Sequence, residues 1–375
     1  MIQWRKIKLS DVCDVIGGGT PSTKNYDFWN GNIPWLTPKD LSGYNRRYIS
    51  KGERNITELG LQNSSTRILP KGSVLLTSRA PIGYLAIAEN EVCTNQGFKS
   101  LVLKEGYDSE FFYYLLKNNI EYIINMGSGS TFAEISGSQV KSLEFNIPPL
   151  DVQRRIAGVL GALDDKIELN NSINNNLEQQ AQAVFLKTIN SNNFDNKLLS
   201  EVATIKYGKG LPTNKLTKVG YKVFGGNGII GYYTEYLYKE PQILISCRGA
   251  ASGAILESHP YSYITNNSLI VELNDRRYYE FLKQYFSLNQ LHSYATGSAQ
   301  PQITIDNLKT VEVPYPNYEV ISDINAYFTS ISNKIYENIC ENEKLSAIRD
   351  ALLPKLMNGE IDVENLPPSA IIPNE

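Results

Sequence analysis

Apolar residues recur at the spacing of a long helix in two stretches of the chain. Across residues 156–188, and again across 324–356, mostly apolar side chains follow one another in alternating steps of four and three residues. These steps place all of them along one seam of a helix, the line that faces a partner helix in a coiled coil. Prolines precede both stretches, at 148–149 and 314–316, and proline is typical of a helix start. The pattern predicts two long helices, the first over 151–189.

Two asparagines occupy equivalent seam positions near the middle of each stretch. They are Asn170 and Asn174 in the first stretch and Asn338 and Asn342 in the second. If the helices pair antiparallel, we expect these four side chains to meet. A polar seam residue lowers stability but fixes register and orientation. The alternative is a local abundance of asparagine, since residues 170–176 contain five, and the sequence leaves both interpretations open.

The two helical stretches belong to an internal duplication of the chain. Residues 129–177 align without gaps to residues 297–345 and are identical at 13 of 49 positions, where average residue usage would give about three. Weaker matches lie upstream and pair Arg79 with Arg248, 94–96 with 265–267, and 9–12 with 199–202. A period this long indicates two duplicated domains and not a solenoid of short repeats.

Each copy begins with a segment of mixed character. Short apolar runs predict strands, aromatic runs predict short helices, and stretches rich in Gly, Asn and Pro predict loops. The strands are expected at 74–77, 101–103, 242–246 and 269–272, the helices at 110–117 and 278–285, and the loops at 16–32, 127–130, 225–231 and 297–301. These elements predict an α+β domain in each copy.

The expected architecture has two similar globular domains joined by two long antiparallel coiled-coil helices, with an approximate two-fold axis between the copies. The first domain would occupy 1–149, the first helix 150–190, the second domain 191–316, the second helix 317–360, and a C-terminal tail 361–375. Duplex DNA also has two-fold axes, and two readers about 34–36 Å apart would match its helical repeat. Because the domains differ in sequence, we expect their half-sites to differ.

The distribution of charge along the chain is more informative than its net charge. The chain has 36 Lys and Arg against 39 Asp and Glu, a net charge of −3, which argues against a protein held to nucleic acid by overall charge. Residues 1–149 and 191–316 nevertheless each carry a net charge of +2, whereas residues 317–375 carry −6. The positive charge therefore lies on the globular segments, and the acidic last helix suits a protein partner better than phosphate.

The chain lacks the motifs of common catalytic sites. It has two histidines, no GxSxG motif and no P-loop, so hydrolase and ATPase sites are not indicated. Its four cysteines are far apart in sequence, with no CxxC pair for zinc, and we expect them to be reduced. No signal-peptide segment or apolar run of about 18–20 residues is present. These features predict a cytoplasmic binding or scaffold protein with no catalytic residue, metal or cofactor of its own.

The basic and tyrosine-rich loops of the two domains are where contacts with phosphates or bases would lie. For any one of these residues, an ordinary solvated surface position is the alternative. The candidates are Lys39, Tyr44, Asn45, Arg46 and Arg47 in the first domain, and Lys206, Tyr207, Lys209, Lys215, Lys218, Tyr232, Tyr233, Tyr236 and Tyr238 in the second.

Several motifs resemble those of type I restriction–modification specificity subunits. In the second copy they are YKVFGGNGIIGY at 221–232, residues 243–253 with their Arg-Gly pair, 265–267 and 297–303; in the first copy they are 71–83, 94–98 and 129–135. Residues 148–156 resemble that family's entry into its spacer helix. The resemblance covers nearly the whole chain. The first copy has Ile-Pro-Trp-Leu at 33–36 where the second has the GGNG loop, which implies a different DNA target.

The resemblance implies a non-catalytic DNA-recognition subunit. Each globular domain would be a target-recognition domain that reads one half of a bipartite, gapped sequence in double-stranded DNA. The helices would set the gap and dock two modification subunits, which carry S-adenosylmethionine and methylate adenines. Two restriction subunits, where a system has them, would use ATP and Mg²⁺ for translocation and cleavage. No membrane contact is implied.

Base contacts are expected where the two copies differ, because the two half-sites would differ. These segments are 20–67, 206–238 and the loops 127–132 and 297–302. They add the candidates Ser128, Ser130, Asn227, Ser298 and Gln300. Arg79 and Arg248, which recur in both copies, would clamp a phosphate or brace a loop. Two other hypotheses stay open at this point: a scaffold or decoy that has lost DNA binding, and an unrecognised hydrolase.

Overall fold

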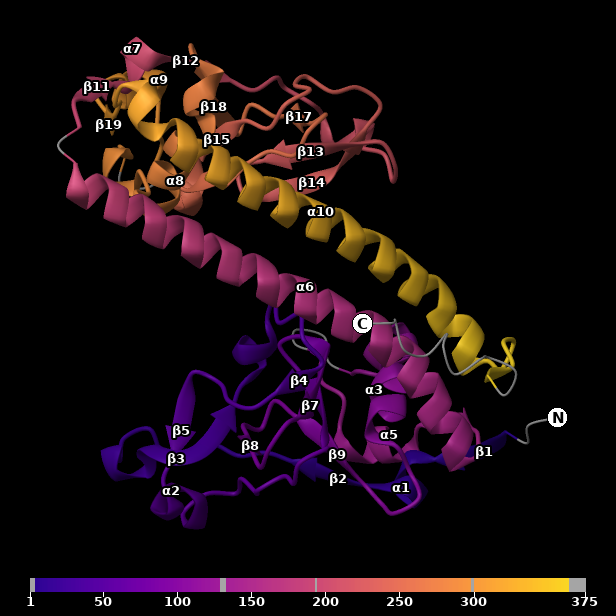
Figure 1. Cartoon of the computed structure of the whole chain (residues 1–375). Coiled ribbons are helices and arrows are strands. Elements are labelled where there is room, and N and C mark those ends of the chain that lie inside the picture. Colours follow the sequence, from indigo (N-terminus) through magenta and orange to yellow (C-terminus); the bar gives the residue numbers. More distant parts are fainter. Residues whose placement is uncertain (1–3, 129–132, 193, 298–299, 364–375) are drawn as a thin grey trace. The chain divides into compact units, whose positions relative to one another are not determined.

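The computed structural model describes residues 4–128, 133–192, 194–297 and 300–363. These residues fall into two units, one formed by 1–171 with 339–375 and the other by 172–338. Each unit holds a globular α+β domain together with parts of two long helices, α6 (Leu150–Ser191) and α10 (Tyr318–Met357) (Figure 1). The predicted α+β class, with two similar domains and two long helices, is confirmed.

The first domain is built around a five-stranded sheet in the order β2-β9-β6-β7-β4. A three-stranded sheet, β5-β3-β8, and a two-stranded sheet, β1-β10, accompany it. The strands are β1 Arg5–Lys8, β2 Cys13–Gly17, β3 Trp29–Leu36, β4 Tyr48–Ile49, β5 Arg54–Ile56, β6 Val74–Ser78, β7 Ile82–Ala88, β8 Cys93–Thr94, β9 Lys99–Leu103 and β10 Glu144–Ile147. The helices are α1 Leu9–Val12, α2 Glu58–Gln62, α3 Ser109–Asn118, α4 Ile120–Asn125 and α5 Gly137–Ser142.

Strand β6 is buried along its whole length because apolar layers cover both faces of the sheet. Val74 and Leu76 point into the larger core, which contains the aromatic side chains of α3. Leu75 points into a second, smaller core on the other face. The larger core also takes in the start of α6 and the end of α10, so the domain and this part of the helix pair fold as one body.

The second domain repeats this plan with a four-stranded sheet, β12-β18-β15-β16, a three-stranded sheet, β14-β13-β17, and a two-stranded sheet, β11-β19. The strands are β11 Asn196–Leu198, β12 Ala203–Tyr207, β13 Tyr221–Gly225, β14 Gly228–Tyr233, β15 Ile243–Ser246, β16 Ile255–Glu257, β17 Tyr263–Ile264, β18 Ser268–Leu273 and β19 Glu312–Pro314. The helices are α7 Leu199–Val202, α8 Tyr279–Leu288 and α9 Ile305–Lys309. Strand β15, like β6, alternates between two cores.

Equivalent backbone contacts in the two domains refine the alignment of the copies. The Asn95 N–H donates to the Leu36 carbonyl at 2.9 Å, and the Thr265 N–H donates to the Phe224 carbonyl at 2.8 Å. In both domains the donor is the residue that directly follows a short strand, β8 or β17. The acceptor lies on the strand that pairs with it in parallel, β3 or β13. Asn95 therefore corresponds to Thr265, one position away from the pairing that residue identity suggested.

The prediction of a loop over 225–231 is wrong. Strands β13 and β14 pair antiparallel across this stretch and form a hairpin that turns at Gly226 and Asn227. Gly228 has φ +107°, a backbone conformation that favours glycine. A glycine-rich composition is shared by loops and hairpin turns, so composition did not separate the two. The predicted loop over 16–32 likewise includes the end of β2 and the start of β3.

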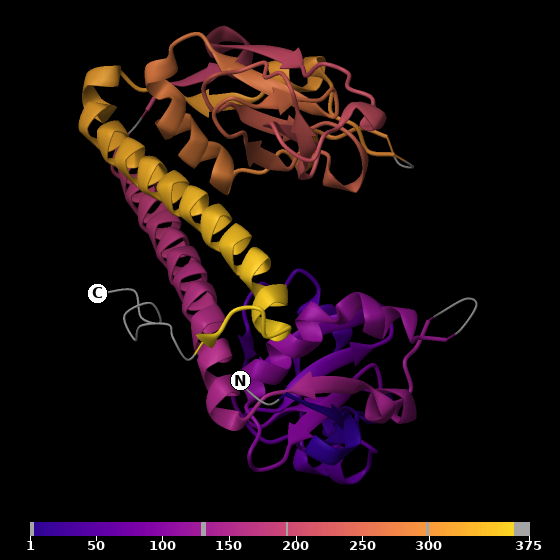
Figure 2. The ribbon, with the colours of Figure 1, turned by 90° about the vertical axis from the view of Figure 1, so that its right-hand side faces the viewer.

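The long helices run antiparallel within each unit. In the first unit Asp164 of α6 pairs with Arg349 of α10, and further along α6 Asn170 reaches Asn342, which comes earlier in α10. Every position of the two predicted seams is buried or half-buried. Figure 2 shows the end of α10 lying beside the start of α6 in the first unit. No described helix combines the length and the apolarity that a membrane span requires.

The seam asparagines hydrogen-bond across the helix pair. In the first unit the Asn170 side-chain amide donates to Asn342 Oδ1 at 2.9 Å and to Glu341 Oε2 at 2.8 Å. In the second unit the Asn338 amide donates to Asn174 Oδ1 at 2.7 Å. Both arrangements pair asparagine with asparagine, as expected if these residues select register. The selection itself stays a prediction.

Replacing the four seam asparagines with leucine is expected to stabilise the protein. A polar residue in a helix seam lowers stability, and replacing both partners of a buried hydrogen bond by apolar groups is neutral or stabilising, so we expect the melting temperature to rise. Thermal unfolding followed by circular dichroism measures the effect. The same change at Asn175 and Asn176, which are exposed, should bring no gain. A large loss of stability in the quadruple variant would contradict the register interpretation.

Candidate nucleic-acid interface

The candidate contacts of the first domain gather on the chain between β3 and β5. Lys39 lies in the short 3-10 helix η2 (Pro38–Leu41), and its ammonium pairs with Glu53 at 2.8 Å. Asn45 and Arg46 are exposed in the loop that follows. Tyr44 is half-buried, and its hydroxyl donates to the Tyr48 carbonyl. This surface therefore offers Lys39, Asn45 and Arg46 to a ligand, whereas the Tyr44 hydroxyl holds the loop.

Arg47 does not belong to this surface, in contrast to the prediction. Its side chain is only 4% exposed and lies among the carboxylates of Glu110, Asp165 and Glu168. Burial by itself would lower the pKa of Arg47, but Tyr114 and the carboxylates around it hold that pKa above its usual value. The guanidinium is thus committed to contacts inside the first unit and is not presented to DNA.

In the second domain the candidate contacts spread over the end of β12 and the β13–β14 hairpin. Tyr207, Lys209 and Lys215 are exposed, as is Asn227 at the hairpin tip. The Tyr232 side chain is half-buried within β14. The hairpin and the end of β12 are the parts of this domain whose side chains can face a ligand.

Lys206 has an acidic neighbour that reduces the charge it offers. Its ammonium lies 2.5 Å from Glu272, which also accepts a hydrogen bond from Tyr238. Burial would raise the pKa of Glu272, but the hydrogen bonds from Lys206 and Tyr238 hold that pKa below its ordinary value. The carboxylate therefore stays ionised, and the pair is close to neutral.

Arg79 and Arg248 occupy equivalent places at the base of two loops. The Arg79 backbone bridges to Glu134 and the Arg248 backbone bridges to Gln302. The Arg79 guanidinium also lies 3.5 Å from Glu134 Oε2, whereas the Arg248 residue is exposed. The contacts of Arg79 favour the bracing interpretation for the first loop.

The predicted contacts in these two loops are described only in part. Ser128 and Gln300 are exposed, and Ser128 shares with Arg79 the backbone bridge to Glu134. Ser130 and Ser298 lie outside the described residues. Their DNA contacts stay predictions.

The structure adds candidates, and contacts between candidates, to those named from the sequence. Arg54 of β5 is exposed, and its guanidinium stacks over the Trp29 ring with 3.5 Å to the centroid. In the second domain, Tyr221, Tyr236 and Tyr261 form an aromatic cluster with centroids 4.9–6.4 Å apart, and Tyr221 and Tyr261 are 39% and 49% exposed. Exposed aromatic rings and oriented guanidinium groups suit contact with bases. Tyr236 was a candidate from the sequence. Only folding brings it to Tyr221 and Tyr261, and Arg54 to Trp29, so local sequence carried no signal for these contacts.

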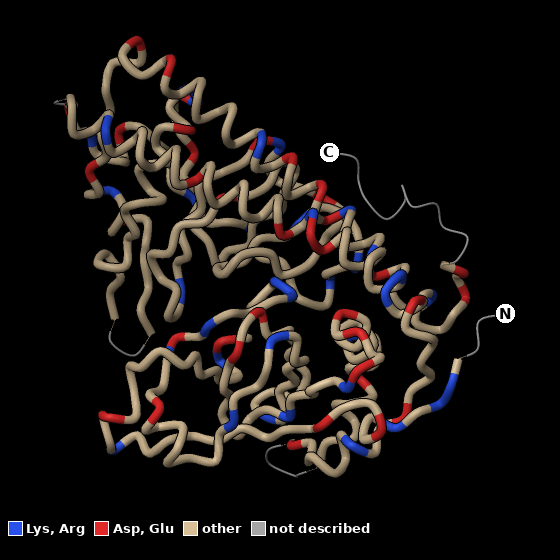
Figure 3. Tube along the Cα trace, turned by 60° about the horizontal axis from the view of Figure 1, so that its bottom comes forward, with Lys and Arg blue, Asp and Glu red and all other residues tan. Residues whose placement is uncertain are grey.

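Charge is mixed on both domains. Figure 3 shows positions of Lys and Arg interspersed with Asp and Glu along the chain of each domain. Within the described residues, no group of three or more His, Cys, Asp and Glu side chains is arranged to hold a metal ion. The chemistry on offer is hydrogen bonding, stacking and local ion pairing.

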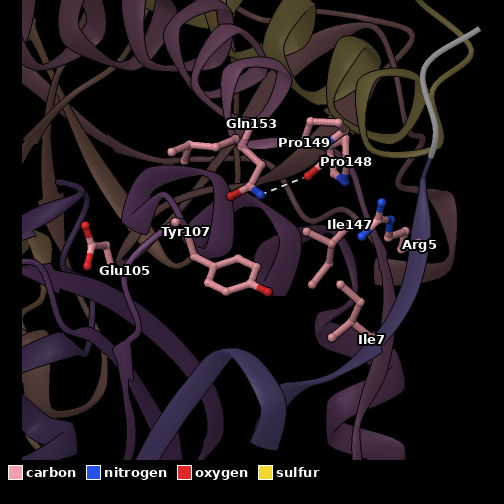
Figure 4. A pocket seen from close by; sticks show the side chains of 10 residues that line it. Arg5, Ile7, Glu105, Tyr107, Ile147, Pro148, Pro149 and Gln153 are labelled. Carbon is pink, nitrogen blue, oxygen red and sulfur yellow. Dashed lines mark hydrogen bonds between the residues drawn. The ribbon is translucent and has the colours of Figure 1, made fainter.

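A pocket of about 330 Å³ lies at the start of α6 (Figure 4). None of the candidate DNA contacts lines it. Gln153 is 1% exposed there; its Oε1 accepts from the Asp108 N–H at 3.0 Å and its amide donates to the Pro148 carbonyl at 2.9 Å. At least one residue of the motif at 148–156 therefore has a structural role: Gln153 connects the first turn of α6 to the start of α3.

Comparison with known proteins decides the family. The model of the type I restriction modification DNA specificity domain matches residues 1–179 and 192–342. The chain belongs to the type I restriction–modification specificity subunits. The two matched segments coincide with the two copies of the duplication, and the resemblance seen in the sequence motifs is confirmed.

Relatives of this specificity subunit match it along most of their length. The MjaIX specificity subunit of Methanocaldococcus jannaschii is 34% identical over 97% of this chain and 94% of its own. The EcoprrI specificity subunit of Escherichia coli is 25% identical over 90% of both chains. The crystal structure of a type I S subunit from M. genitalium has the same fold, with a TM-score of 0.59 at 19% identity over 95% of this chain and 96% of that one. Specificity subunits are the non-catalytic members of these systems.

Proposed function

We propose that the two globular domains of this specificity subunit read the two halves of a bipartite, gapped sequence in double-stranded DNA. The observation that carries the proposal is the repetition of one fold with different exposed side chains at equivalent places. Next to the short parallel strand, the first domain presents η2, Asn45, Arg46 and the Arg54–Trp29 stack. The second domain presents the β13–β14 hairpin with Asn227. Two related scaffolds with different surfaces suit two different half-sites.

We propose further that α6 and α10 dock two modification subunits, which carry S-adenosylmethionine and methylate adenines. The net charge of −6 over residues 317–375, of which α10 itself carries −2, supports a protein partner for this C-terminal part, because it would repel phosphate. Where restriction subunits are present, two of them would add ATP- and Mg²⁺-dependent translocation and cleavage. We propose that the complex acts in the cytoplasm, where its DNA substrate would lie.

Single-molecule methylome sequencing of the host, with and without the gene, tests the proposed function. We expect a bipartite motif with methylated adenine in both halves to disappear when the gene is removed and to return on complementation. A methylome that is identical in the two strains, while the modification subunits are expressed, would contradict the proposal.

The isolated chain is expected to bind DNA weakly. Lys39, Arg79 and Lys206 each have an acidic side chain within ion-pair distance. The phosphate contacts of the isolated chain would therefore depend on a few exposed basic residues such as Arg46, Lys209 and Lys215. We expect a dissociation constant of about 10⁻⁶ M or weaker at physiological salt, as in non-specific binding. Adding the modification subunits should produce a sequence-specific mobility shift. Tight, specific binding by the purified chain alone would contradict this account.

A further inference from the structure

The loop at 42–47, with the short strand β4 that follows it, is joined directly to the long helix α6 within the first unit. Arg47 projects from this loop, and its guanidinium lies at ion-pair distance from Glu168 (3.7 Å), from Glu110 (3.4 Å) and from Asp165. The Arg47 backbone N–H also donates to Glu168 Oε1 at 2.9 Å. Asp165 and Glu168 belong to α6. Side chain and backbone of one residue therefore both bind the helix.

Helix α6 is shaped to receive this arginine. Gly161 lies where a Cβ atom would come within 2.8 Å of Arg47 Nη1 and 3.2 Å of Glu110 Oε2. Glycine inside a helix is unfavourable compared with alanine, so its presence at this position requires a reason. The space needed by the guanidinium supplies one.

The same loop is held from its other side by the sheet. The Ile87 N–H of β7 donates to the Arg47 carbonyl at 2.7 Å, and the Tyr48 hydroxyl donates to Glu110 on α3. Within this fixed frame, the preceding residues Asn45 and Arg46 are exposed. The backbone that carries these two candidate contacts thus has little freedom to move along α6.

The second unit joins its domain to its helix differently. There Lys283 of α8 contacts Glu257, Glu280 and, at 2.6 Å, the hydroxyl of Ser332 on α10. This contact arises from a domain helix and not from a loop with candidate DNA contacts. In the same unit the ring of the loop residue His259 packs against Tyr336 of α10, with 5.6 Å between centroids. The attachment of a reading loop to a spacer helix through a buried arginine is therefore particular to the first copy.

We propose that Arg47 is a positioning residue that makes the first recognition domain discriminate the length of the gap in the DNA target. The inference rests on the proposed function. One base pair added to the gap moves a half-site by about 3.4 Å and about a tenth of a turn. A loop tied to Glu168 of α6 by contacts of 2.9 Å and 3.7 Å has no slack of that size. Asn45 and Arg46 would then meet only a half-site at the right distance.

The test uses the complete complex of this chain with its modification subunits. Duplexes carry the motif found by methylome sequencing, with its natural gap or with one base pair added or removed. Arg47→Met keeps a long side chain but removes the guanidinium. We expect the ratio of kcat/KM between natural and altered gaps to fall by about tenfold, as for the loss of a coupled polar network. An unchanged ratio would overturn the proposal.

Gly161→Ala tests the same contact between Arg47 and α6 without removing a charge. It tests the role of Arg47 even if Arg47→Met fails to fold. Alanine is the better helix former, which offsets part of the lost ion pairing, but its Cβ displaces the guanidinium, so the ratio should fall. Leu101→Ala is the control, because it opens a cavity in the core of the same domain, where Leu101 is fully buried. It should lower stability and leave the ratio unchanged. Equal loss of discrimination in Leu101→Ala would overturn the proposal.

These outcomes are separate from those of the proposed function. If the wild-type complex methylates no bipartite motif, the proposed function fails. If it methylates one and the Arg47 and Gly161 variants keep the wild-type ratio, only the role of Arg47 fails.

Discussion

Exchange of residues 191–316 for the same segment of another specificity subunit is expected to change one half of the methylated motif and leave the other half unaltered. The segment contains the strands β11 to β19 complete, so every sheet of the second domain is exchanged as a whole. Its core also uses Phe185 of α6 and Phe328 of α10. A donor with apolar residues at these positions should therefore be chosen. The motif is measured by methylome sequencing of cells that carry the hybrid.

The gap length should not change in this hybrid, because it retains both long helices and the contacts of Arg47 with α6. The reciprocal exchange of residues 1–149 serves as the control and should alter the other half of the motif. A change in both halves after a single exchange would show that the domains do not read DNA independently.

Asp164→Ala is expected to cause the largest loss of stability among single substitutions in the helix pair. The Asp164 side chain is 7% exposed, lies 2.5 Å from Arg349 Nη1 and accepts a hydrogen bond from the Tyr114 hydroxyl at 2.7 Å. Removing the carboxylate leaves a largely buried guanidinium and a buried hydroxyl without this partner. Loss of one member of a buried pair lowers the free energy of unfolding by about 3–5 kcal/mol. Urea denaturation followed by circular dichroism measures it.

Asp350→Ala provides the matched control for this substitution. Asp350 also contacts Arg349, at 2.8 Å, but its side chain is 60% exposed. Exposed ion pairs contribute about 0–1 kcal/mol, so this variant should unfold close to the wild type. Similar losses in the two variants would show that burial of Asp164 does not decide its contribution.

The long helices and the duplication were predictable because their signals are local or repeated. Seam residues three and four positions apart lie on one side of a helix whatever surrounds it, and α6 and α10 extend over the predicted stretches. The duplication could likewise be detected from residue identity between the copies, without knowledge of how the residues pack. The sequence matched Asn95 to Asn266, one residue away from Thr265, because identity ignores the hydrogen bonds that define equivalent backbone positions.

The candidate interface was predictable only as a region. Sequence differences between the copies directed attention to 20–67 and 206–238, and the exposed Asn45, Arg46 and Asn227 lie there. Sequence differences between the copies do not distinguish an exposed arginine from a buried one. Arg46 and Arg47 are adjacent and chemically identical, yet one is exposed and the other is 4% exposed at its side chain.

The amino-acid sequence alone thus established the family, the two-domain organisation and the paired helices, since these depend on periodicity and on similarity along the chain. The tertiary structure decided which side chains can face DNA. The partners of Arg47 on α6 are 118 and 121 residues away in sequence, and Trp29 meets Arg54 only because β3 and β5 pair. Burial and partnership of a charged side chain are set by contacts between distant segments, which no local pattern records.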